Sequence, residues 1–252
     1  MNDYKERLAT TLEVNPFISY KEAICHIIRD DIIAGVYAPH YRLVEYKIAD
    51  AFGTSRTPVK QAFEELERQG FIYLKASTGA FVAPYDASVF SDLFRVRYIL
   101  ERQACGQACE RATAQDLRKL FRYCVEMDKA YQHYGDNESD VAEDNFHRHL
   151  IECAHNEYLL KAYSSIELQI QRFRKYVTRS WKQMEAAKLP EEKYPFVHIG
   201  VEFDKHRTYL FKTQISYEHY LIYHAIYNRS PTAATSAHMF LMSLNNPTQL
   251  FL

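Results

Sequence analysis

Glycine, proline and long apolar runs are scarce in this sequence, and each scarcity excludes a class of protein. Only 7 glycines and 8 prolines occur in 252 residues, which argues against a many-turned β fold and favours long helices. No apolar run approaches the roughly 18–20 residues that a membrane span needs. The first twelve residues are charged and lack the apolar segment of a secretory signal. We therefore expect a mainly helical, cytoplasmic protein with no membrane partner.

Paired cysteines and an excess of positive charge are also missing. The five cysteines contain no C-x-x-C pair, which suits neither a zinc ribbon nor a disulfide framework, so we expect buried free thiols. The net charge is −1, and the first 85 residues hold nearly equal numbers of cations and anions. A nucleic-acid function would therefore have to depend on where the cations lie, because their sum gives no excess.

Capping residues and apolar spacing predict three helices near the start of the chain. Ser19 followed by Glu22 is a capping box, and a stripe of isoleucines runs from there to Gly35. A shorter helix ends at Gly53, and the next two residues can cap a third helix. The expected helices span 19–34, 44–52 and 55–69. The short connection around Gly53 is typical of a helix-turn-helix.

Two β-prone runs, 71–75 and 80–83, flank a turn that contains Gly79. Three helices and then a hairpin predict a winged helix-turn-helix, which we assign to residues 1–84. Residues 84–86 have the composition of a linker, and most of the chain beyond them is helix-periodic. The fold class is therefore mainly α, with an N-terminal winged helix-turn-helix and a C-terminal all-helical bundle over residues 85–252. Its expected helices are 88–112, 115–134, 139–154, 157–187, 214–228 and 231–245, with Gly135 as one stop and 188–213 unassigned.

The helix at 55–69 has opposite chemistry on its two faces. Its apolar residues share one face: Val59, Ala62, Phe63 and Leu66. Arg56 and Lys60 lie together on the other face in the N-terminal half, and glutamates occupy the C-terminal half. A recognition helix enters the major groove by its N-terminal end, where an arginine can read guanine. A solvated face on a helical bundle is the alternative interpretation.

Hydroxyl groups and a hairpin turn complete the candidate interface. Ser55 and Thr57 can donate to phosphates beside the positive end of the helix dipole. Thr78 and Gly79 at the tip of the wing can approach the minor groove, because glycine permits close contact. The chemistry thus predicts DNA contacts from both the third helix and the hairpin.

The chain from residue 33 to residue 79 resembles the GntR family of bacterial regulators. The resemblance is carried by 33–39, Arg42-Leu43, 48–59, Ala62, Leu66-Glu67, 70–72 and Gly79, and above all by Gly53-x-Ser55-Arg56-Thr57-Pro58-Val59. It implies DNA contacts from Ser55, Arg56, Thr57, Lys60 and the wing at Gly79. Two departures stand out. Lys60 replaces the usual Arg and loses its bidentate geometry, and His40 replaces the usual Gly in a turn.

The second domain resembles the FadR-type subgroup, whose ligand-binding part is a helical FCD bundle. The residues that carry this looser match are 97–101, 143–147, His155-Asn156, 218–222 and Ala225-Ile226. The resemblance implies dimerisation, a small-molecule effector and often a divalent metal, Zn²⁺ or Ni²⁺, held by one Asp and three His. Here the aligned ligands are Glu143, in place of Asp, with His147 and His219. Leu241 stands at the fourth position, and His238 lies one turn earlier as a substitute.

These departures leave two interpretations of the bundle centre open. Glu143 and His147 are four residues apart on one helix face, a spacing suited to chelation. Alternatively the metal is lost and the two histidines are polar walls of a pocket. By resemblance Arg97 would face a carboxylate effector, whereas a salt bridge with Glu101 is its structural alternative.

The sequence as a whole predicts a DNA-binding transcriptional regulator and not an enzyme. We expect a homodimer on a palindromic, double-stranded operator, with affinity controlled by a small carboxylate, directly or through a bound metal. The alternative is a metal-free DNA-binding protein whose helical domain only dimerises or docks a partner. A zinc enzyme that uses Glu143 as a base lacks a recognisable nucleophile and leaves the first domain unexplained.

Overall fold

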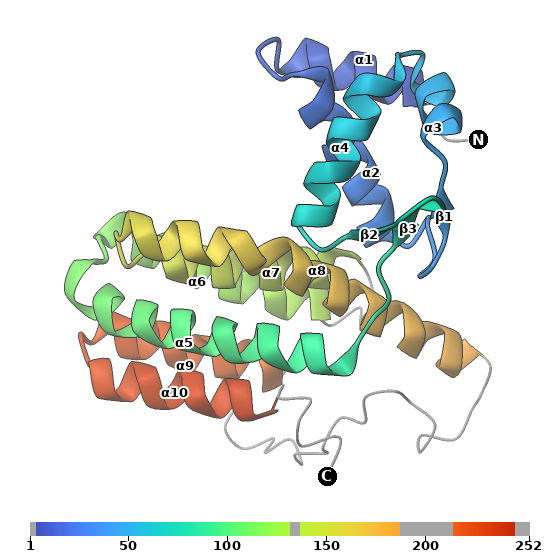
Figure 1. The fold of residues 1–252 in the computed structure, drawn as a ribbon. Helices are drawn as coiled ribbons and strands as arrows, with labels where there is room; N and C mark the ends of the chain where they lie inside the picture. Colours follow the sequence, from blue (N-terminus) through green and yellow to red (C-terminus); the bar gives the residue numbers. More distant parts are fainter. Residues whose placement is uncertain (1–3, 132–136, 187–213, 245–252) are drawn as a thin grey trace. The chain divides into compact units, whose positions relative to one another are not determined.

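The computed structural model of the chain describes residues 4–131, 137–186 and 214–244. Two compact units succeed each other along the chain, Met1–Asp86 and Ala87–Leu252. Helices dominate both units, and the strands in the described ranges all lie in the first (Figure 1). The helices within these ranges include no candidate for a membrane-spanning segment.

The first unit is a winged helix-turn-helix, as the sequence predicts. Its elements are α1 (Tyr4–Val14), α2 (Tyr20–Ala34), β1 (Arg42–Leu43), α3 (Glu45–Phe52), α4 (Arg56–Arg68), β2 (Ile72–Lys75) and β3 (Gly79–Val82). The strands form an antiparallel sheet in the order β1-β3-β2. The three predicted helices and the hairpin are confirmed, each with ends shifted by no more than one residue.

Helix ends in this unit are set by local chemistry. The Ser19 hydroxyl accepts a hydrogen bond from the Glu22 amide at 3.2 Å, and the Ser19 amide donates to the Glu22 carboxylate at 2.9 Å. This capping box begins α2. Gly35 and Gly53 end α2 and α3 with φ angles of 78° and 65°, in the left-handed region that favours glycine.

Two elements of the first unit have no clear signature in the sequence. Helix α1 buries only Tyr4 and Leu8, so no apolar stripe marks it. Strand β1 has two residues and depends on its partner strand, because Arg42 pairs with Phe81 and Leu43 with Ala80. Both elements depend on tertiary contacts, which local sequence patterns do not encode.

The second unit is an all-helical bundle, and its six predicted helices are confirmed. They are α5 (Ala87–Arg111), α6 (Ala114–Tyr131), α7 (Asn137–Glu152), α8 (Glu157–Ala186), α9 (Gln214–Tyr227) and α10 (Pro231–Leu244). The predicted stop at Gly135 and the unassigned stretch 188–213 lie outside the described residues.

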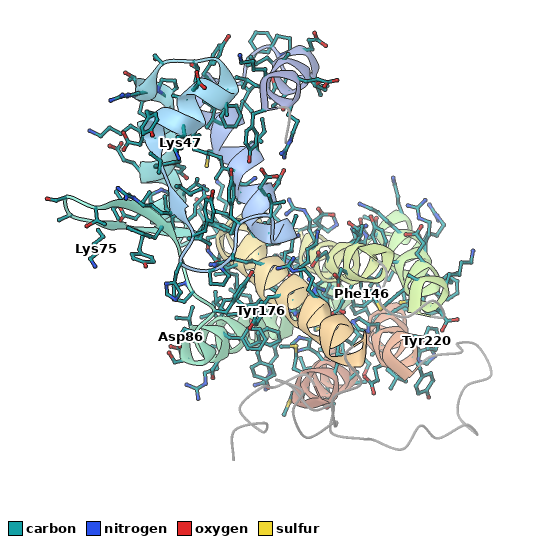
Figure 2. The ribbon with its side chains drawn as sticks, turned by 90° about the vertical axis from the view of Figure 1, so that its right-hand side faces the viewer. Lys47, Lys75, Asp86, Phe146, Tyr176 and Tyr220 are labelled. Atoms are coloured by element: carbon teal, nitrogen blue, oxygen red, sulfur yellow. The ribbon has the colours of Figure 1, made fainter. Side chains whose placement is uncertain are left out.

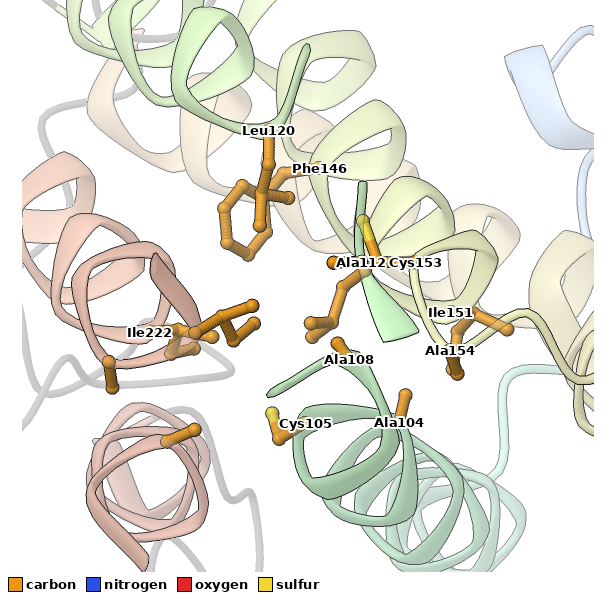
Figure 3. Packing of buried hydrophobic residues seen from close by; sticks show 14 of the residues in the cluster. Ala104, Cys105, Ala108, Ala112, Leu120, Phe146, Ile151, Cys153, Ala154 and Ile222 are labelled. Atoms are coloured by element: carbon orange, nitrogen blue, oxygen red, sulfur yellow. The ribbon is translucent and has the colours of Figure 1, made fainter. Parts of the chain in front are cut away.

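The core of this unit forms where α5, α6, α7 and α9 meet. Small side chains of α5 face larger ones from the other helices (Figure 3): Ala104, Cys105 and Ala108 lie opposite Leu120, Phe146 and Ile222. All five cysteines of the chain are free and buried, which confirms the interpretation of the thiols. Because α5 presents small residues, its neighbours pack closely against a helix that also carries charged side chains.

Candidate functional site

Helix α4 buries one face and exposes the other, as expected. Its buried side chains are Val59, Ala62, Phe63 and Leu66, each at most 1% exposed. Ser55, Arg56, Thr57 and Lys60 are exposed around its first turns. The predicted cations therefore lie at the leading end of a helix that the rest of the unit holds firmly.

The charges along α4 are used differently at its two ends. Glu65 pairs with Arg68 at 2.5 Å, and Glu67 accepts a hydrogen bond from the Leu74 amide at 3.0 Å. These carboxylates thus serve local structure in the C-terminal half. Among the described residues Arg56 and Lys60 have no carboxylate partner, and the Arg56 guanidinium lies over the Tyr46 ring at 5.9 Å. Cations without partners are the groups that can neutralise phosphates without first breaking an ion pair.

The start of α4 differs from expectation at its cap. Ser55 is the N-cap residue, but its side chain makes no cap hydrogen bond in the described structure. Ser55, Arg56 and Thr57 are all exposed, so the start of the helix is accessible. Such a helix start binds anions well, because the amides and the helix dipole both favour negative charge.

The wing presents a second exposed group beside β1. Thr78 is half-buried, its hydroxyl donates to the Ala76 carbonyl at 3.2 Å, and Gly79 is exposed. A Cβ at Gly79 would stand 3.7 Å from Nε of Arg42, an exposed residue of β1. Lys75 projects from the same hairpin (Figure 2). The wing residues were predictable from the sequence, but Arg42 was missed, because only strand pairing brings it to the hairpin turn.

The second unit contains a buried polar cluster centred on Glu101 of α5. The Arg97 Nε donates to its carboxylate at 2.7 Å, and His238 Nε2 lies 2.9 Å from its other oxygen. His147 Nδ1 approaches the first oxygen at 3.1 Å. Each of these four side chains is at most 4% exposed. Glu101 therefore accepts hydrogen bonds from Arg97 of its own helix and from His238 of α10, with His147 of α7 close by.

The expected metal ligands lie beside this cluster. Glu143, His147 and His219 each offer a ligand atom, and these atoms lie within 4.8 Å of one another. His147 Nε2 is 3.1 Å from His219 Nε2 and 3.9 Å from the Glu143 carboxylate. Arg174 of α8 also contacts Glu143, at 3.2 Å. The structure thus brings the three predicted side chains together from α7 and α9.

Electrostatics favour the metal-binding protonation states of Glu143 and His147. Burial disfavours a charge on Glu143, but the positive charges around it, that of Arg174 first, together outweigh burial and hold the pKa of Glu143 well below its usual value. Burial, aided by the charge of Arg97, lowers the pKa of His147 and favours its neutral form. A carboxylate and a neutral imidazole are the forms that bind a divalent metal.

The donor set fits a metal of the zinc class. Two ligands on one zinc ion lie about 3 to 3.5 Å apart, given bonds of about 2.0–2.1 Å to nitrogen. The 3.1 Å separation between the two Nε2 atoms falls in that range, and the 3.9 Å from His147 Nε2 to the Glu143 carboxylate lies slightly beyond it. Glu101, at 3.1 Å from His147 Nδ1, is the outer carboxylate that commonly orients a metal-binding histidine. Glu143, His147 and His219 would hold the metal, which leaves coordination positions for water or a ligand.

Two other candidate residues make different contacts. His238 is the suggested fourth ligand, but its Nε2 is bound to Glu101 and its ring stacks on Tyr98 at 5.6 Å. It does not join the other three residues. Arg97 adopts the salt bridge with Glu101 that was its structural alternative. To bind an effector, Arg97 would therefore have to use guanidinium N–H groups other than the Nε that donates to Glu101.

A second group of ligand-type side chains lies near the start of α6, and local sequence patterns do not indicate it. Asp116, His149 and Cys153 offer ligand atoms within 4.8 Å of one another. The Asp116 carboxylate already accepts from the Thr113 amide at 2.8 Å and lies 2.8 Å from His155 Nε2. His149 Nδ1 lies 2.9 Å from Glu152 and its Nε2 3.1 Å from the Asp116 carbonyl. Capping and ion pairing explain this group without a metal.

A winged helix-turn-helix whose α4 exposes cations without carboxylate partners among the described residues, together with a helical unit that holds a buried polar cluster, is typical of a two-domain DNA-binding regulator. Comparison with known proteins agrees. The profile of "Bacterial regulatory proteins, gntR family" matches residues 20–82, and that of the FCD domain matches residues 92–191. The chain belongs to the GntR family of transcriptional regulators and carries a C-terminal FCD domain.

Individual relatives support the same assignment, each over part of the chain. The chain is 32% identical over 141 residues to the Nta operon transcriptional regulator of Aminobacter aminovorans, covering 56% of this chain and 66% of that protein. It is 28% identical over 130 residues to the uncharacterised HTH-type transcriptional regulator YdhC of Bacillus subtilis, covering 51% of this chain and 58% of that protein. The chain thus spans about three fifths to two thirds of the length of these curated relatives.

A solved structure matches over nearly the whole chain. The crystal structure of a GntR protein from Rhodococcus sp. RHA1 superposes with a TM-score of 0.66 and 19% sequence identity. The match covers 92% of this chain and 98% of that one. At this identity the likeness establishes the fold.

Proposed function

We propose that this protein is a sequence-specific regulator that reads an operator through α4 and the wing. Ser55, Arg56, Thr57 and Lys60 contact the major groove and its phosphates, and Thr78 and Gly79 contact the minor groove. The observation that carries the proposal is the exposure of Arg56 and Lys60, without carboxylate partners among the described residues, on a helix whose other face is buried.

A mobility-shift titration tests this proposal with DNA from upstream of the protein's own gene and an unrelated duplex of equal length. Arg56→Ala should weaken operator binding by about 1–3 kcal/mol, the usual worth of a good arginine–guanine pair. Arg118→Ala is the matched control, because Arg118 is exposed on α6 and should bind as the wild type does. Equal affinity of the wild type for both duplexes, with an indifferent Arg56→Ala variant, would refute the proposal.

The second part of the proposal concerns the FCD domain. A small carboxylate effector binds near the buried cluster, and Glu143, His147 and His219 hold a divalent metal, Zn²⁺ or Ni²⁺. When bound, such a metal supplies a Lewis acid that attracts a carboxylate. Arg97, already beside Glu101, adds positive charge to the same region. The support is the 3.1 Å approach of the two imidazole Nε2 atoms next to a carboxylate.

Metal binding can be measured without DNA. Zn²⁺ or Ni²⁺ added to chelator-treated protein should raise Tm, since a ligand that binds only the folded state stabilises it. His219→Ala should abolish that rise, whereas His224→Ala, an exposed histidine on the same helix, should retain it. The alternative is a metal-free protein whose helical domain only dimerises or docks a partner, and a Tm indifferent to both metals would favour it. The metal-free alternative is supported by the 3.1 Å distance between the Nε2 atoms of His147 and His219, at which the two imidazoles can hydrogen-bond to each other without a metal.

The last part of the proposal is the assembly on DNA. A homodimer would place two recognition helices about 34–36 Å apart on a palindromic operator. Sedimentation of the protein with an operator duplex should give two chains per duplex. A single chain bound to a full operator would contradict the dimer.

A further inference from the structure

Helix α1 lies outside the part of the chain that matches the GntR profile, which begins at residue 20. In the structure it nonetheless packs against α2 and α3 (Figure 1). Helix α3 is the first helix of the helix-turn-helix. The unit therefore holds a helix from outside the matched region beside its DNA-reading elements.

A buried hydrogen-bond network fixes α1 in place. The Tyr4 hydroxyl donates to the Asp31 carboxylate at 2.6 Å, and Arg7 pairs with the other oxygen of that carboxylate at 2.8 Å. The Tyr37 hydroxyl lies 2.6 Å from that of Tyr4. The Tyr4 ring also stacks on Phe52 at 4.6 Å, so one residue connects α1 to both α2 and α3.

Asp31 explains why this docking is specific. It lies in the last turn of α2 and is only 4% exposed. A carboxylate there is unfavourable, because the helix dipole is negative at that end and burial removes water. Tyr4 and Arg7 supply the donor and the positive charge that such a group requires. Asp31 is thus the main polar residue of α2 that binds α1.

The docked helix places a cation beside the helix-turn-helix. The Lys5 side chain crosses the end of α3, where its Cε would stand 3.0 Å from a Cβ at Gly53. Lys5 is exposed and has no carboxylate partner among the described residues. Gly53 is the C-cap of α3 and lies just before the exposed start of α4 at Ser55. The lysine therefore borders the same turn that leads into the recognition helix.

We propose that α1 extends the DNA interface, with Lys5 binding a backbone phosphate beside the turn between α3 and α4. This inference rests on the proposed function, because it requires that α4 meets DNA. A lysine on a phosphate adds affinity that depends on salt but not on sequence. Lys5 would therefore strengthen binding to operator and to unrelated DNA alike.

The test uses the full-length chain with operator and unrelated duplexes over a series of salt concentrations. Lys5→Ala should weaken binding to both duplexes by a similar factor and reduce the slope of log K against log salt by about 0.9, the contribution of one phosphate contact. Lys5→Arg should retain the wild-type slope. Lys161→Ala, an exposed lysine of α8, is the control and should change neither quantity.

Tyr4→Phe asks whether the network is what positions the lysine. It removes the hydroxyl that binds Asp31 while it keeps the ring on Phe52, so we expect a lower Tm and part of the same loss of slope. Wild-type slope and affinity in Lys5→Ala would overturn this inference alone. Failure of the wild-type chain to bind DNA would overturn the proposed function and this inference with it.

Discussion

Glu101 shows how one residue can hold a buried site together. Its carboxylate receives Arg97, His147 and His238 from three helices. Burial disfavours its charge, yet Arg97, whose charge contributes most, together with His147 and His238 holds the pKa of Glu101 well below its usual value. Glu101 is therefore ionised in the folded protein, and its negative charge compensates the buried positive charge of Arg97.

Glu101→Gln should leave the Arg97 charge buried without its counter-ion. Breaking a buried pair in this way costs about 3–5 kcal/mol of stability. Urea denaturation monitored by circular dichroism measures the change. The control is Glu110→Gln, an exposed glutamate of the same helix, which should stay within about 0.5 kcal/mol of the wild type. If Glu101→Gln were as stable as this control, Arg97 would not need Glu101 as a counter-ion.

Asp116 gives a prediction that depends on pH. Burial disfavours its charge, but hydrogen bonds from the Thr113 amide and hydroxyl, and from His155, lower its pKa to about 2. Because the folded value lies below the unfolded value of about 4, the carboxylate stabilises the fold fully above pH 4. That stabilisation is lost as the pH falls toward 2.

Asp116→Asn should therefore destabilise the protein at pH 7 by about 1 kcal/mol, as loss of a helix cap does. The gap to the wild type should narrow below pH 4, which unfolding curves between pH 7 and pH 3 can track. The exposed Asp92 provides the matched control, Asp92→Asn. A gap that stays constant over this range would assign the effect to packing and not to charge.

The residues of the candidate sites were predictable to different degrees. Arg56 and Lys60 could be assigned from the sequence, because helical spacing alone puts them opposite Val59 and Phe63. The hub role of Glu101 could not, since its partner His238 is 137 positions away along the chain. Local spacing predicts which residues share a helix face, but it does not say which faces meet.

At the scale of elements, caps and periodicity predicted most helices because their determinants are local. The capping box at Ser19 and the glycine stops at Gly35 and Gly53 are contained within a few residues. Helix α1 escaped prediction because its stability comes from Asp31 and Phe52, which lie in other helices. Elements that others hold in place leave little trace in their own sequence.

Two glycines in different elements should respond oppositely to the same substitution. Gly53 ends α3 with φ +65°, and a new Cβ would stand 3.0 Å from the Lys5 side chain, so Gly53→Ala should cost about 1 kcal/mol or more. Gly106 lies inside α5, and a Cβ there meets nothing within 4 Å, so Gly106→Ala should stabilise by about 0.5–1 kcal/mol. Thermal unfolding of both variants checks the signs. A shift in the same direction for both would contradict this account.

At the scale of the whole molecule, the two units have separate cores, one around α4 and one around α5. We expect them to act as two domains that unfold separately, since each buries its own apolar residues.

Calorimetry should then resolve two transitions. Gly53→Ala should lower one and leave the other unchanged, and Gly106→Ala should raise the other alone. A single transition whose calorimetric and van't Hoff enthalpies agree would mean that the units unfold together. Separate unfolding would instead be consistent with the effector control proposed above, because independently folded units can change their relative pose without losing either core.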